Sequence, residues 1–69
     1  MTVTDIMHTA SRYGYAYDIA ARAIDYYRDE QRTGGGEYWD DRGPLSLLEA
    51  VNRDAEHPVV VPESYTRKF

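Results

Sequence analysis

Asp5 and His8 are the residues whose types and spacing come closest to a metal site in this chain. Residues three positions apart share one face of a helix, as the carboxylate–histidine pairs of metal-bearing helical bundles do. The ligand set lacks the inward-facing glutamates that complete such sites, and the sequence contains two histidines and no cysteine. We therefore expect a solvated pair near a helix start, with no bound metal and no cofactor.

Glu37, Asp40 and Asp41 form an acidic group of the kind that acts as an acid–base pair or binds a divalent cation. Their spacing is not that of an oxygen-ligand loop, and a chain of 69 residues has little room for a water-excluding pocket. His57 has no catalytic partner near it in the sequence. The three glycines at 34–36 do not follow a strand, so they lack the context of a phosphate-binding loop. We expect a protein that binds and has no enzymatic activity.

Tyr38 and Trp39 lie between these acids, and aromatic side chains supply much of the binding energy at protein interfaces. Two interpretations of Trp39 stay open. It folds back as a roof over a helical pair, or it is an exposed anchor for another protein. In the second case, Asp40 and Asp41 would steer the approach of a basic, apolar groove on the partner. The predicted partner-binding residues are therefore Tyr38, Trp39, Asp40 and Asp41.

A long helix, from Thr2 or Thr4 to about Arg32, is the main element expected to position these residues. Eight apolar or aromatic residues recur alternately three and four positions apart, the period of a helix packed along one face. We call these residues the seam: Val3, Ile6, Ala10, Tyr13, Tyr17, Ala20, Ile24 and Tyr27. Gly14 weakens the helix by about 1 kcal/mol relative to alanine. Because the seam stays in phase across Gly14, we predict one helix.

A second apolar arc lies beside the seam on the same predicted helix. Its members are Tyr15, Ala16, Ile19, Ala23 and Tyr26. A helix that is apolar over more than half of its circumference needs more cover than one short second helix provides. We therefore predict a homodimer, in which two long helices pack side by side in a coiled-coil-like bundle. The predicted self-association residues are Ile6, Tyr13, Tyr17, Ala20, Ile24 and Tyr27.

The rest of the predicted fold is a glycine-rich loop over residues 34–43 and a short antiparallel second helix. This helix begins at Pro44, which suits a first helical position, or at the capping box that starts with Ser46. It ends near His57, before a proline. The expected fold is thus all-α, with a helical hairpin domain over residues 1–57. Residues 58–69 follow as an extended Pro/Val segment and a polar tail.

Composition narrows the classes of partner and location. The net charge of −4 disfavours binding to nucleic-acid phosphates, which requires clustered lysine and arginine. The longest apolar run, Val59–Val61, is far shorter than the roughly 20 residues of a membrane span. The first residues lack the basic start and apolar run of a signal peptide. We expect a cytoplasmic protein without a membrane partner.

These observations predict a small non-enzymatic protein-binding module that self-associates and modulates a partner macromolecule by occupying its surface, as an inhibitor does. The small size, and an amino-acid composition typical of a GC-rich genome, suit a phage or mobile-element accessory protein that acts on a host factor. Two alternatives stay open. One is a small DNA-binding regulator, although its second helix offers only Arg53 for reading bases while Glu49 and Asp54 would oppose phosphates. The other is a structural or assembly subunit of a larger particle.

Overall fold

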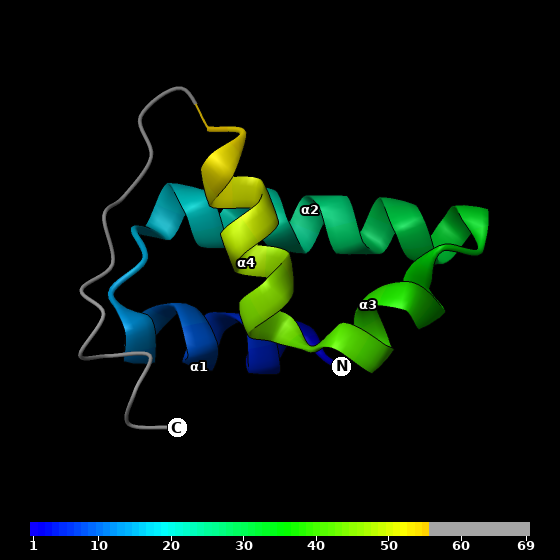
Figure 1. Ribbon diagram of the computed structural model, residues 1–69, viewed down its shortest axis with the longest axis horizontal. Coiled ribbons are helices and arrows are strands. Elements are labelled where there is room, and N and C mark those ends of the chain that lie inside the picture. The colour runs from blue at the N-terminus through cyan, green and yellow to red at the C-terminus, as the bar shows by residue number, and fades with distance from the viewer. Residues whose placement is uncertain (56–69) are drawn as a thin grey trace.

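The computed structural model describes residues 1–55, which form four α-helices and no strand (Figure 1). The prediction of an all-α fold is confirmed at this level. The helices are α1 (Val3–Tyr13), α2 (Tyr17–Thr33), α3 (Gly36–Arg42) and α4 (Pro44–Arg53). The extended segment predicted over residues 58–69 lies outside the described residues.

Thr2 caps the start of α1, which is one of the two starts that the sequence predicts. The Thr2 hydroxyl accepts a hydrogen bond from the Asp5 backbone N–H at 3.1 Å, and the Asp5 carboxylate accepts one from the Thr2 N–H at 2.8 Å. This reciprocal pair satisfies amides that no helical carbonyl can reach. It also holds the Asp5 charge at the positive end of the helix dipole. Asp5 is therefore a capping residue of α1.

The prediction of one helix from the first threonines to Arg32 is wrong, because the helix breaks at Gly14. Gly14 has left-handed backbone angles, φ 81° and ψ 19°, and the amides of Gly14 and Tyr15 both donate to the Ala10 carbonyl. This pattern of bonds ends a helix. After the three linker residues 14–16, α2 runs back beside α1 in the opposite direction (Figure 1). Apart from the exposed Tyr17, the two halves of the seam thus pack into one core within a single chain, which a single straight helix could not do.

The loop predicted over residues 34–43 contains a two-turn helix, α3. As predicted, glycine ends the helix before it, since Gly34 takes the left-handed conformation at φ 93°. Gly36 then starts α3 against the side of α2. A Cβ atom on Gly36 would lie 3.0 Å from Cγ of Gln31, so this close approach depends on the missing side chain. The result is a short helix held tightly against the end of α2.

α4 begins at Pro44, one of the two predicted starts, and the alternative start at Ser46 is not used. It ends at Arg53 and not near His57 as predicted. The backbone N–H of Ala55 donates to the Asn52 carbonyl, three residues back, and this bond tightens the last turn. α4 lies across both α1 and α2, and it covers the seam where those helices meet (Figure 1).

The core lies where α1, α2 and α4 meet. Leu47 and Leu48 of α4 are fully buried there. Three of the buried side chains are alanines, and small side chains let helix axes approach closely. Within residues 1–55, the eleven buried hydrophobic residues are Ile6, Ala10, Tyr13, Tyr15, Ile19, Ala20, Ala23, Ile24, Tyr27, Leu47 and Leu48. Burying a leucine side chain contributes about 1.5–3 kcal/mol, so the two leucines anchor α4.

We expect Leu47→Ala to lower the free energy of unfolding by about 3 kcal/mol, because it removes buried methyl groups and leaves a cavity. Leu45 of the same helix is only partly buried, so Leu45→Ala is a matched control that should cost clearly less. Urea unfolding followed by circular dichroism measures both values. Equal losses for the two variants would contradict the position of α4 described above.

Candidate protein-binding surface

Trp39 lies at the centre of an aromatic cluster that joins α2 and α3. Its ring is half-buried and packs against the core. It meets Tyr26 of α2 edge-on, with ring centroids 5.9 Å apart at 75°, and Tyr38 at 4.9 Å and 88°. Edge-to-face pairs of this kind contribute about 0.5–1.5 kcal/mol beyond the burial of their area. Trp39 thus covers part of the core, as the first interpretation predicts, and it remains partly exposed, as an anchor for another protein would be.

The two tyrosines of this cluster are largely exposed. Tyr26 retains 44% of its accessible surface and Tyr38 retains 53%. The guanidinium carbon of Arg42 lies 4.5 Å from the centroid of the Tyr38 ring, which is a cation–π contact. At an exposed site such a contact is worth about 0.5–1 kcal/mol, so Arg42 favours this orientation of the Tyr38 ring while leaving the ring accessible to solvent.

Two small hollows lie on either side of Trp39, and both also contact Ala50 of α4. The first has a volume of about 260 Å³, and its other lining residues are Arg22, Tyr26, Val51 and Asp54. The second has a volume of about 210 Å³, and its other lining residues are Tyr38, Arg42, Ser46, Glu49 and Arg53. We call the aromatic cluster and these two hollows together the Trp39 surface. It is built from α2, α3 and α4.

The charge around the Trp39 surface differs from that of the other described residues. Its hollows are lined by three arginines and two carboxylates. The remainder of residues 1–55 carries three arginines and eight carboxylates. The two hollows therefore carry one more arginine than carboxylate on an acidic protein. Beside them, burial, followed by the carboxylate of Glu30, raises the pKa of Tyr26. Asp40 and Asp41, the acids expected to steer a partner, line neither hollow, and their role in binding stays a prediction.

Asp40 lies on the side of α3 that faces α2 and the first residue, and it does not line either hollow. Its Oδ1 accepts a hydrogen bond from the Tyr27 hydroxyl at 2.6 Å and one from the amino group of Met1 at 3.0 Å. Gln31 Nε2 donates to the same hydroxyl at 3.2 Å. Asp40 therefore holds α3 in place through these bonds, although it is exposed, as the neighbouring Asp41 is.

The Tyr27–Asp40 bond shifts the pKa of both groups. The hydrogen bond to Asp40, followed by burial, raises the pKa of Tyr27 above its ordinary value. The hydrogen bond from Tyr27, followed by that from the Met1 amino group, lowers the pKa of Asp40. Both shifts mean that the bonded state is a neutral tyrosine beside an ionised aspartate.

Five of the six predicted self-association residues lie in the core of a single chain. Their side chains, at positions 6, 13, 20, 24 and 27, are at most 9% exposed. A side chain covered by its own chain cannot also form an outer contact surface, so these residues do not offer a second copy a free face. Tyr17 differs, because it is 78% exposed at the first position of α2. α1, folded back, covers much of the apolar face of α2 for which the sequence suggested a second chain, and the homodimer stays a prediction.

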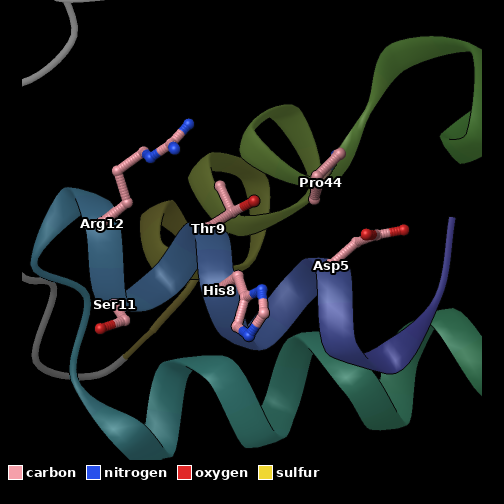
Figure 2. A pocket seen from close by; sticks show the side chains of 6 residues that line it. All are labelled: Asp5, His8, Thr9, Ser11, Arg12 and Pro44. Carbon is pink, nitrogen blue, oxygen red and sulfur yellow. The ribbon is translucent and has the colours of Figure 1, made fainter.

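A larger hollow, of about 580 Å³, lies between α1 and the start of α4 (Figure 2). The side chains that line it, those of Asp5, His8, Thr9, Ser11, Arg12 and Pro44, point in different directions and do not converge on one point. Asp5 is already engaged in capping α1. Within residues 1–55, no three His, Asp or Glu side chains are grouped so that they could hold a metal ion. In the same range, no helix is both long and apolar enough to cross a membrane.

The sequence indicates Tyr38 and Trp39 as candidate binding residues. It does not indicate the residues from other helices that complete the Trp39 surface. The sequence places Tyr26 in the second apolar arc. Its position at one edge of that arc within α2 is the sequence signal for its exposure. Arg42 and Arg53 carry no sequence signal of their own. They join the surface only because α3 and α4 pack against each other.

Comparisons with known proteins found no matching family model, no similar characterised protein and no similar solved structure.

We expect the difference in unfolding free energy between the wild type and Tyr27→Phe to be largest near neutral pH. The raised pKa of Tyr27 means that its contribution is complete below the ordinary tyrosine pKa and is lost as pH rises through the raised value. The lowered pKa of Asp40 means that its contribution is complete above the ordinary aspartate pKa and is lost as pH falls through the lowered value.

Urea unfolding of the wild type and of Tyr27→Phe, repeated from acid to alkaline pH, measures this difference in free energy directly. Subtracting the Tyr27→Phe curve removes the titration of the other tyrosines. A difference that stays constant from acid to alkaline pH would show that the hydroxyl and the carboxylate do not interact.

Proposed function

We propose that this protein is a non-enzymatic protein-binding module whose Trp39 surface takes a short, acidic segment of another protein with an apolar or aromatic side chain. The observation that carries this proposal is the aromatic cluster itself. Tyr26 and Tyr38 are exposed on either side of a half-buried tryptophan. Tryptophan, tyrosine and arginine are the residues that most often dominate binding energy at interfaces.

The size of the hollows supports a protein partner over a small-molecule ligand. Pockets for drug-sized ligands have volumes of about 300–1,000 Å³ and enclose most of the ligand. The hollows beside Trp39, at about 260 and 210 Å³, are each smaller than this. They suit individual side chains of a segment that lies across Trp39. The orientation of Tyr38 that Arg42 favours would lower the entropy lost on binding.

The charge of the surface favours an acidic partner. Arg22, Arg42 and Arg53 line the hollows, and they stand out on a protein whose other described residues are strongly acidic. Complementary charge steers an approaching partner and suppresses wrong ones. The DNA-binding alternative gains no support, because Arg53 is accompanied by two exposed carboxylates, Glu49 of α4 and Asp54 directly after it.

Binding to a library of short acidic peptides with one aromatic residue tests this proposal. Trp39 is the only tryptophan, so its fluorescence reports occupancy of the surface without a label. For a selected peptide, we expect Trp39→Ala to cost about 2 kcal/mol or more of affinity, and Tyr38→Ala about 1 kcal/mol or more. Binding of the variants is measured by calorimetry.

Tyr17→Ala is the matched control, because Tyr17 is a more exposed tyrosine that lines neither hollow. It should leave affinity unchanged. Combined Arg42→Glu and Arg53→Glu should weaken binding and reverse its salt dependence. A peptide that binds the Tyr38→Ala, Trp39→Ala and arginine variants as tightly as the wild type would place the binding site elsewhere.

A further inference from the structure

We propose that two copies of this chain exchange α1 through the linker at residues 14–16. In the exchanged dimer, the linker becomes helical, α1 and α2 join into one long helix, and each α1 packs on α2 and α4 of the other copy. The partner is a second copy of this chain, and the binding surface is the face of α2 and α4 that α1 covers in the monomer. This inference does not depend on the Trp39 surface.

The phase of the seam is the first observation behind this proposal. Its residues stay three and four positions apart across Gly14, although the helix breaks there. A hairpin of two independent helices does not require such a match, because the linker uncouples the rotation of one helix from that of the other. A continuous helix does require it. Joining α1 to α2 would therefore present both halves of the seam on one side.

The antiparallel packing of α1 on α2 is the second observation. In the monomer, α1 and α2 run in opposite directions (Figure 1). If two opened chains lay side by side in opposite directions, α1 of each would meet α2 of the other in that same relative orientation. The contacts of Ile6, Ala10 and Tyr13 can then be rebuilt between chains. Only the short linker has to change conformation, which is the usual situation in domain swapping.

Tyr17 and Tyr15 lie where the two long helices would cross. Tyr17 is a seam residue with no place in the monomer core, since it is 78% exposed. Tyr15 is the one core residue in the linker itself. In the exchanged dimer, the central crossing would bring these residues from both copies together. The exposed member of the seam would thus gain the burial that its spacing predicts.

Gly14 favours the closed monomer. Its left-handed conformation at φ 81° is open to glycine, whereas glycine inside a helix is unfavourable. The short linker also holds α1 near α2 at a high effective concentration. We therefore expect the wild type to be monomeric at micromolar concentration.

Gly14→Ala is the direct test, because alanine disfavours the left-handed conformation and favours the helix. Nothing lies within 4 Å of a Cβ atom at this position, so the substitution acts on backbone conformation and not through a clash. Alanine destabilises the left-handed turn of each monomer and stabilises the long helix in both chains of the dimer. The monomer–dimer association constant should therefore rise by about a thousandfold. Sedimentation equilibrium from micromolar to submillimolar concentration, with circular dichroism, should show a helical dimer.

Gly34→Ala is the matched control. Gly34 also has a positive φ, 93°, with nothing within 4 Å of a Cβ atom, but the seam does not continue across it. This variant should lose stability and remain a monomer. Gly14→Asn should also remain a monomer, because asparagine tolerates the left-handed conformation.

A second substitution separates exchange from simple association. Ala16 has φ −67° and ψ 156°, which proline adopts readily, whereas proline inside a long helix is strongly unfavourable. Adding Ala16→Pro to Gly14→Ala should therefore restore the monomer. The proposal is overturned by a monomeric or unfolded Gly14→Ala protein at every concentration, by a dimeric Gly34→Ala protein, or by a dimer that survives Ala16→Pro.

Discussion

The packing of α1 against α2 is the interaction on which the rest of this structure depends. A chain without cysteine, and this short, must build its core from helix faces alone. Turning back at Gly14 brings two apolar faces together within one chain. α4 then lies over the line where they meet, and its two fully buried leucines complete the core. Without that turn, α4 would have only one helix to cover.

The position of α3 follows from the end of α2 and determines the shape of the Trp39 surface. Gly36 lets α3 start against α2, and the bond between Tyr27 and Asp40 holds the two helices together. This arrangement turns Trp39 toward Tyr26 of α2, so that residues thirteen positions apart form one aromatic cluster. A structural hydrogen bond on one side of α3 thus fixes the aromatic side chains on the other.

Much of the fold could be predicted from the sequence, because the helical period and the capping residues are local signals. Seven of the eight seam residues do lie in or against the core, and Thr2, Gly34 and Pro44 act at helix ends as predicted. The period could not show that the seam folds back on itself, since a continuous and a broken helix share it. α3 was missed because it is short and its formation depends on contact with α2. The arginine content of the Trp39 surface was missed because its arginines come from three helices.

The alanines of the core have a consequence for how relatives of this chain would be recognised. Ala10, Ala20 and Ala23 are buried where helices pack closely, and a larger side chain at any of them would push two helices apart. Large core residues, by contrast, can exchange with one another while total volume is kept. We therefore expect homologues to keep small side chains at these buried positions more strictly than they keep any particular large side chain elsewhere in the core. Their common pattern would consist of alanine and glycine positions, with variable aliphatic and aromatic residues between them.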